Sequence, residues 1–260
     1  SGYFSLGYAY TNSRDRRNMF NSTAGSNFDQ TAAFDRQDPA SSRGFFESRH
    51  NFTLSSTLRV TFFADLATSF GFTFLARSGR PYSLTFAQGG VFNDSSSGNN
   101  NALVYIPTGV DDPNISPNWN MDAVNQLVNF AKGLDCAKDY VGRTIARNSC
   151  TNDWYYDLDL RIAQELPGFA RAVGLNGVRD KFQVYAMFDN FLNFLDDSWN
   201  IQRRRNFAGL QEVAELNRGS SGFSANSGFD SEGRYVISSF LGQDAIDEDN
   251  FINVSSSVWR

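Results

Sequence analysis

The chain has 260 residues, of which 41% are hydrophobic and 15% aromatic, with a net charge of −5 and a single histidine. This mildly acidic balance gives no reason to expect nucleic-acid binding, and the excess of Phe and Tyr suits strands and membrane interfaces better than a hydrolytic active site. No apolar run approaches the roughly 18 residues of a membrane-spanning helix, so the sequence excludes helical spanning. A mean hydropathy of −0.40 still allows membrane strands, whose two faces average out.

The first segment, residues 3–11, alternates strictly between two kinds of side chain. A period of two is typical of a β-strand with two different faces. The aromatic face then meets either a protein core, as in a sandwich, or lipid, as in an outer-membrane barrel. Even positions hold Phe4, Leu6, Tyr8 and Tyr10, and odd positions hold Ser5, Gly7, Ala9 and Thr11.

The same alternation returns along the chain and predicts an all-β fold of about eight antiparallel strands. The polar faces carry Ser, Thr, Gly, Tyr and Asp rather than the Lys and Glu of a solvated sandwich. The clearest strands match the roughly 9–11 tilted residues that cross a bilayer. After the first strand the segments are 51–62, 69–77, 154–163 and 181–189 and, less clearly, 207–216, 233–240 and 253–260.

The apolar rows are therefore expected on the lipid-facing outside of a transmembrane β-barrel, and the other face is expected to line a polar lumen. Asp157 and Asp159 also have the spacing of an acid–base pair, but Arg161 on the same face favours a hydrogen-bonded ladder. The lipid-facing candidates are Phe4, Leu6, Tyr8, Phe70, Phe72, Phe74, Leu158 and Leu160. The lumen-lining candidates are Asp157, Asp159, Arg161, Gln183 and Asp189.

The connections between these strands are unequal in length. Long polar loops at 14–44, 87–150 and 190–206 alternate with shorter turns at 63–66 and 167–178. This is the pattern of a barrel whose one end faces the outside and whose other end faces the periplasm. We therefore expect the longest loop on the side opposite the 63–66 turn.

The longest loop contains both cysteines, Cys136 and Cys150, and a short amphipathic segment at 121–132. In an exported protein the cysteine pair predicts a disulfide, which closes a loop worth about 3 kcal/mol on the chain-entropy model. A redox or metal pair is the alternative, although no histidine or second cysteine pair is near enough to complete a zinc site. The segment at 121–132 predicts a helix that either packs on the loop or moves as a lid.

Two further features of the sequence invite functional interpretations. His50 begins a strand and has no Ser, Cys or acidic residue at triad-like spacing, so we interpret it as a strand-end residue. Arg203, Arg204 and Arg205 are too few in an acidic chain for nucleic acid. They are candidates for contact with a loop ligand or with lipopolysaccharide phosphates, and the alternative is a solvated loop.

Five short motifs resemble, in order and setting, the region near the end of Oar-like TonB-dependent receptors. They are RSGRPYS at 77–83, NALVYIP at 101–107, RNSC at 147–150, WYYDLDLRIAQELP at 154–167 and DNFLNFLDDSWN at 189–200. The resemblance implies that residues 1–260 are the C-terminal part of a plugged barrel of about 22 strands in the outer membrane of a Gram-negative cell. It departs from the family in FNDSSSGNN, which is poorer in acids than the usual run, and in ending on SSSVWR.

The leading hypothesis is a receptor without enzymatic activity, cofactor or metal, which imports an extracellular ligand with energy from a TonB-type complex. That complex would engage a plug-containing region absent from these residues. The alternatives are a structural or adhesive surface barrel, and a soluble carbohydrate-binding β-sandwich. Because the inward side chains Ser5, Gly7, Ala9 and Thr11 are too small to fill a narrow barrel, we expect an open sheet. Its first and last strands, near 2–13 and 253–260, should not pair with each other.

Overall fold

The computed structural model describes most of the chain. The described residues are 1–19, 21–63, 65–87, 101–117, 120–174, 180–197, 199–200, 203–204, 209–217, 228–242, 252–253 and 258–259.

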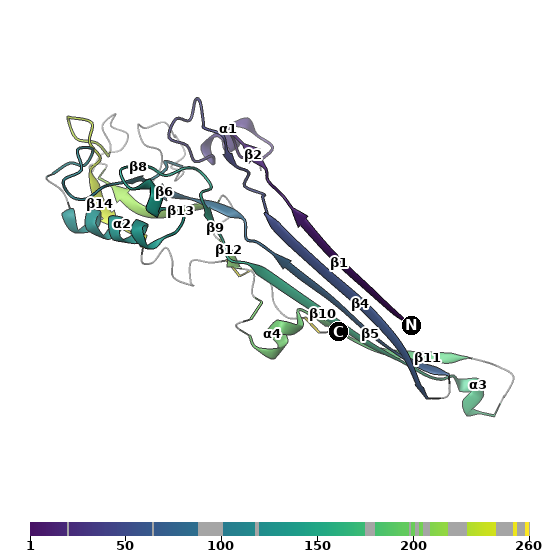
Figure 1. Ribbon diagram of the computed structural model, residues 1–260. Helices are drawn as coiled ribbons and strands as arrows, with labels where there is room; N and C mark the ends of the chain where they lie inside the picture. Colours follow the sequence, from purple (N-terminus) through teal and green to yellow (C-terminus); the bar gives the residue numbers. More distant parts are fainter. Residues whose placement is uncertain are drawn as a thin grey trace.

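A six-stranded antiparallel sheet forms the elongated part of the molecule (Figure 1), which we call the long sheet. Its longest strand has 14 residues, and its members follow the alternating segments of the sequence. The expectation of an all-β, antiparallel architecture is confirmed for this sheet. In spatial order the strands are β1 (Gly2–Tyr10), β4 (His50–Phe63), β5 (Leu66–Arg77), β10 (Tyr155–Pro167), β11 (Lys181–Asp189) and β16 (Val258–Trp259).

The strand register brings apolar side chains together on one face. Leu6 lies opposite Leu54, Leu54 lies opposite Phe74, and Phe74 lies opposite Leu158. Since side chains alternate along a strand, these pairings place every predicted lipid-facing residue on this apolar face, and every predicted lumen residue on the opposite, polar face. A slip of one residue in any strand would invert its faces.

The long sheet is open in the part of the chain that the structure describes. β1 lies at one edge, where β4 is its neighbour, and β16 lies at the other edge, where it pairs with β11. As expected, the described residues of the first and last strands do not pair with each other. No closed barrel forms among the described residues.

The two ends of the long sheet differ, as the loop lengths predict. At one end the chain turns tightly between β4 and β5, close to the short helix α3 (Phe169–Ala172), which follows β10. At the other end Figure 1 places the elements of the longest loop, including a long helix. The described part of the 87–150 loop thus lies opposite the turn between β4 and β5, as expected.

A second body, the packed lobe, occupies that end of the sheet. A four-stranded sheet of β14 (Ile237–Phe240), β13 (Leu210–Leu216), β6 (Pro81–Phe86) and β9 (Cys150–Thr151) forms its centre. Around it lie α2 (Met121–Gly133), η2 (Lys138–Tyr140) and the pair β7 (Tyr105–Ile106) and β8 (Arg143–Thr144). Its core includes Phe86, Val104, Ile106, Leu127 and Val213, each at most 1% exposed.

The packed lobe corrects the expected number of barrel strands. We expected 207–216 and 233–240 to join the barrel, but β13 and β14 lie in the lobe, and β13 pairs in parallel with β6. Leu210 pairs with Ser83 and Ala214 pairs with Phe86, so these two residues of β13 lie on opposite faces of the sheet, and both are buried. A strand buried on both faces belongs to a core, so the described long sheet has six strands rather than eight.

The predicted helix at 121–132 is confirmed by α2. Its first turn is capped by the Asn120 side chain, which accepts a hydrogen bond from the backbone N–H of Ala123 at 3.1 Å. Val124, Leu127, Val128 and Ala131 are buried against the packed lobe. This burial favours a packed helix over a moving lid.

The remaining elements are short. Three of them belong to the 14–44 segment at the lobe end: β2 (Arg14–Asp15), β3 (Ser42–Arg43) and α1 (Ala24–Asp29). α4 (Phe191–Leu195) follows β11, and β12 (Arg203–Arg204) pairs with β15 (Ile252–Asn253). Among the described helices, none combines the length and the apolar character needed to cross a membrane.

Candidate functional site

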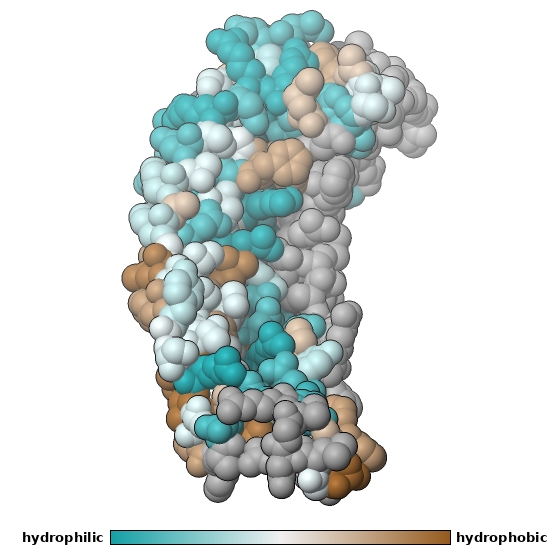
Figure 2. Space-filling view, turned by 90° about the vertical axis from the view of Figure 1, so that its right-hand side faces the viewer, coloured by the Kyte–Doolittle hydropathy of each residue, from teal (hydrophilic) through white to brown (hydrophobic). Residues whose placement is uncertain are grey.

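The apolar face of the long sheet is the most unusual surface of the molecule, because its large side chains are exposed. Phe4 is 65% exposed, Leu6 69%, Phe70 41% and Val184 59%. Side chains of this size and number are normally buried in a monomeric soluble protein. In Figure 2 hydrophobic side chains gather toward the bottom of the view, where Figure 1 places the turn end, whereas the top is mostly hydrophilic.

Aromatic rings concentrate where this face approaches the packed lobe. The ring centroids of Tyr8 and Phe52 are 4.6 Å apart. The rings of His50 and Trp154 are stacked, with their centroids 6.0 Å apart. The Tyr8 hydroxyl and Nδ1 of His50 are 3.0 Å apart. Trp154 in turn stacks on Tyr156 at 6.3 Å. His50 is thus a strand-end residue within an aromatic row, as its sequence position predicted.

The polar face brings the predicted lumen residues onto one surface but not into one cluster. By register, Asp189 lies opposite Asp159, whereas Gln183 pairs with Glu165 toward the turn end. The guanidinium of Arg161 lies over the ring of Tyr185, 5.6 Å from its centroid. The five candidates therefore lie on the same face of the sheet but at different positions along its strands.

The ladder predicted among Asp157, Asp159 and Arg161 does not form within the described residues. Asp157 instead accepts a hydrogen bond from the Tyr155 hydroxyl at 3.2 Å. Asp159 accepts one from the backbone N–H of Asn190 at 2.9 Å. The two carboxylates therefore hold neighbouring polar groups of their own strand and of the segment after β11.

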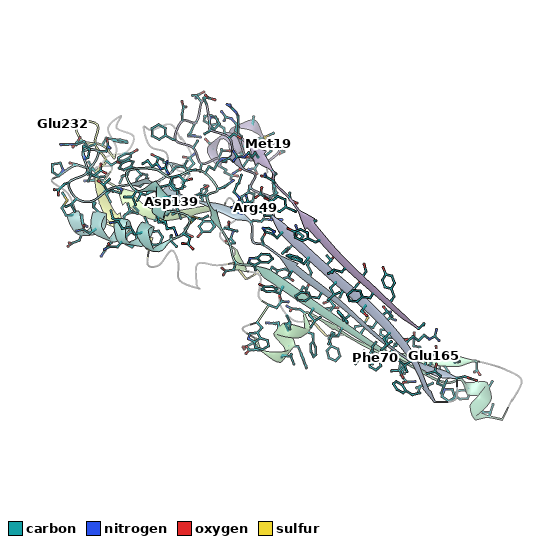
Figure 3. The ribbon with its side chains drawn as sticks, in the orientation of Figure 1. Met19, Arg49, Phe70, Asp139, Glu165 and Glu232 are labelled. Atoms are coloured by element: carbon teal, nitrogen blue, oxygen red, sulfur yellow. A yellow bond between two sulfur atoms is a disulfide. The ribbon has the colours of Figure 1, made fainter. Side chains whose placement is uncertain are left out.

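Sequence reasoning missed the polar cluster around Glu165, at the turn end of the same face (Figure 3). The Glu165 carboxylate pairs with Arg59, and its Oε2 lies 2.8 Å from Nζ of Lys181. Lys181 also donates to the carbonyl of Asp65 at 2.6 Å. These residues come from three different strands and one turn, so no local spacing in the sequence could have predicted the cluster.

A buried carboxylate, Glu47, joins the long sheet to the 14–44 segment. Its side chain has no exposed surface, and it accepts hydrogen bonds from the Ser13 backbone N–H at 2.7 Å and from Nε of Arg43 at 2.9 Å. Arg49 lies 3.0 Å away on the same carboxylate. Burial alone raises the pKa of Glu47, but these donors and cations outweigh it and hold the pKa below its ordinary value.

Another buried acid, Asp112, organises the interior of the packed lobe. It accepts hydrogen bonds from the backbone N–H groups of Thr108 at 2.8 Å and Asn114 at 2.9 Å, and from the Tyr105 hydroxyl. Burial raises the pKa of Asp112, but the donors outweigh it and the pKa lies below its ordinary value. Burial raises the pKa of Tyr105, whose ring stacks on Tyr235. At neutral pH Asp112 is therefore ionised and Tyr105 keeps its proton.

A hollow of about 600 Å³ lies beside α1, at the lobe end of the molecule. Arg17 lines it, with its guanidinium 4.9 Å from the centre of the Phe28 ring, and so does Met19, which is 76% exposed. Volumes of this order suit small ligands. The other lining residues are Ala24, Gly25, Asn27, Asp29 and Gln37.

The remaining predicted site residues have different outcomes. The disulfide is confirmed, because Cys136 and Cys150 are bonded and link the region of η2 to β9. Arg203 and Arg204 form β12, where they pair with Asn253 and Ile252 of β15. The structure does not describe their side chains. Arg205 lies outside the described residues, so contact with a ligand or with lipopolysaccharide stays a prediction.

No group of metal-ligating side chains occurs among the described residues. Comparison with known proteins found no match to a protein-family model, a curated protein or a solved structure. The candidate functional surfaces are therefore the exposed apolar face, the polar face behind it and the lobe end with its hollow.

Proposed function

We propose that this chain forms part of the wall of an outer-membrane β-barrel receptor, in which the apolar face meets lipid. The observation that carries the proposal is the exposure of aromatic and aliphatic side chains along a long, open antiparallel sheet. In a sandwich the same side chains would pack against a second sheet. The five motifs that resemble Oar-like TonB-dependent receptors support the same class.

Strand length supports a membrane span. β4 has 14 residues, and at about 3.3 Å per residue it extends roughly 46 Å. Tilted by about 45°, such a strand rises roughly 33 Å, slightly more than the apolar thickness of an outer membrane. The exposed aromatic row at His50 and Trp154 then lies near one membrane surface, where aromatic rings are favoured.

The unequal ends suggest the orientation. Outer-membrane barrels carry short turns on the periplasmic side and long loops outside. The tight turn between β4 and β5 would then face the periplasm, and the packed lobe and the hollow beside α1 would face the outside. The lobe end would capture the ligand, whose identity the surface does not specify.

The polar face would line the lumen around a plug, with Asp157, Asp159, Arg161, Gln183 and Asp189 facing the interior. Small side chains such as Gly7 and Gly71 on this face leave room for another domain. Import would draw energy from a TonB-type complex through a region outside residues 1–260. Outer-membrane lipid and lipopolysaccharide would surround the apolar face.

The test uses the complete reading frame expressed in a Gram-negative host. We expect the protein in the outer-membrane fraction, with a mobility in detergent gels that changes on heating. A single cysteine replacing Gln126 on the lobe should react in whole cells with a membrane-impermeant maleimide. A cysteine replacing Val173 beside the turn should react only after lysis. A soluble product would contradict the proposal.

The receptor is distinguished from a structural or adhesive barrel by its energising partner. Cross-linking in intact cells should join the complete protein to a TonB-type protein. An outer-membrane barrel that never forms this cross-link, and whose plug-coding region is absent, would identify the structural alternative.

A further inference from the structure

The wall of the long sheet is interrupted at the end of β11. Leu160 pairs with Phe188, so Asp189, the last residue of β11, lies opposite Asp159. β10 begins four residues earlier, at Tyr155, and its residues 155–158 pair with β5 but with no described residue of β11. On this side of β10 Figure 1 shows α4. α4 thus occupies the position beside β10 that a longer β11 would take in the sheet.

α4 is tied to the polar face by asparagines. Asn190 adopts the left-handed conformation, with φ 56° and ψ 54°, and thereby turns the chain out of β11. Its backbone N–H donates to Asp159, and Nδ2 of Asn200 lies 3.5 Å from Oδ1 of Asp157. Nδ2 of Asn190 also donates to the carbonyl of Asn200 at 3.2 Å. The two predicted lumen acids therefore anchor this segment.

On the other side, α4 continues the apolar face. Phe188 belongs to that face, because it pairs with Leu160. The rings of Phe191 and Phe194 each lie 5.7 Å from the ring of Phe188. Phe194 is 51% exposed, and Leu195 is 58% exposed. The lipid-facing row of β11 therefore extends onto the helix without a break.

A tryptophan follows the helix at the rim of this patch. Trp199 is 52% exposed, and its backbone carbonyl accepts a hydrogen bond from Asn193 at 2.9 Å. The next residue, Asn200, lies 3.5 Å from Asp157 near the start of β10, the strand on which Tyr156 stacks against Trp154. Amphipathic rings of this kind are favoured where lipid headgroups meet acyl chains.

We propose that α4 and Trp199 form a lipid anchor, in which Phe194, Leu195 and Trp199 insert into the outer leaflet at its interface. This inference rests on the proposed membrane location and deepens it. Lipid is the occupant that the structure favours, because the exposed patch is continuous with the apolar face of the long sheet. The asparagine contacts hold the helix at the wall.

The test compares three spin-labelled cysteine variants of the complete protein in phosphatidylethanolamine–phosphatidylglycerol nanodiscs. They are Leu195→Cys on the anchor, Phe70→Cys on the apolar face and Gln126→Cys on the lobe. Collision rates with oxygen and with a water-soluble nickel complex report immersion in lipid and in water. We expect the oxygen-to-nickel ratio at 195 to exceed that at 126 several-fold and to be no greater than that at 70.

The outcomes separate the anchor from the proposed function. If the label at 70 is in lipid but the label at 195 has the same oxygen-to-nickel ratio as the label at 126, the lipid anchor is contradicted. The proposed membrane barrel is not contradicted by that result. If the label at 70 is also in water, the membrane location itself is overturned.

A second measurement requires no introduced cysteine. Phospholipids brominated near the headgroup should quench part of the tryptophan fluorescence, and Trp199→Phe should remove a measurable share of that quenching. Trp154→Phe is the matched control on the sheet itself. Unchanged quenching in Trp199→Phe, together with reduced quenching in Trp154→Phe, would contradict the anchor but not the barrel.

Discussion

The long sheet and the packed lobe are both built from strands, yet they differ in the solvent exposure of their large apolar side chains. Phe70 in the long sheet is 41% exposed, and Phe86 in the lobe is fully buried. In the lobe, α2 and strands from distant segments contribute buried side chains to one core with the small sheet. In the long sheet one face keeps its aromatic residues uncovered. The same residue type is therefore packed into a core in the lobe and left exposed in the long sheet.

The sharpest test of this comparison is truncation of the two phenylalanines. Phe86→Ala should reduce the free energy of unfolding of the lobe by about 3–5 kcal/mol, because it empties a closed core. Phe70→Ala should cost far less, because its site is already open. Urea unfolding, followed by proteolysis at sites in each of the two regions, measures both variants. Equal costs would show that the two regions do not differ in packing.

A charge on the apolar face gives the next largest effect. Leu158→Arg should cost about 2–4 kcal/mol in a membrane barrel if the site lies near mid-bilayer. The matched control is Gln183→Arg on the polar face, which should be nearly neutral because that side chain is exposed to water. Folding into phospholipid vesicles, titrated with urea, gives both values. A tolerated Leu158→Arg would contradict lipid contact there.

The disulfide belongs to the lobe alone, so its removal should affect the two regions differently. Replacing Cys136 and Cys150 by serine should cost the lobe about 3 kcal/mol, because the unfolded chain gains the freedom of the opened loop. The long sheet should keep its stability. Thiol alkylation of the unreduced protein provides the direct control, and modification of both cysteines would show that the bridge is absent.

Glu47 tests the junction between the 14–44 segment and the long sheet. Glu47→Gln should cost about 1–3 kcal/mol at neutral pH, because it weakens charge-assisted hydrogen bonds in a buried position. The pKa of Glu47 is lowered on folding from 4.5, so its contribution is present above about pH 4.5 and is lost as the pH falls through the folded value. Proteolytic susceptibility of the 14–44 segment between about pH 6 and 3 should show this loss in the native protein and a flatter profile in Glu47→Gln.

Residue alternation was sufficient to predict the long sheet and its faces. Because side chains of a strand alternate with period two, the rows of Phe70 and Leu158 had to share a face once the strands paired antiparallel. The disulfide and α2 were also predictable, since a cysteine pair in one loop and an amphipathic stripe are local signals. The lobe strands were not, because β13 reads locally like a barrel strand and only its pairing with β6 reveals burial on both faces.

The sequence by itself determined which side chains lie together on each strand, where helix α2 begins and ends, and which two sulfurs bond. Only the tertiary structure decided that Asp157 and Asp159 hold Asn200 and Asn190 rather than Arg161. It also decided that Glu165 gathers Arg59 and Lys181 from separate strands. Periodicity is a local property of the chain, whereas hydrogen-bond and ion-pair partners depend on which distant segments the fold brings within a few ångströms. For that reason the faces could be predicted before the partners of the polar residues were known.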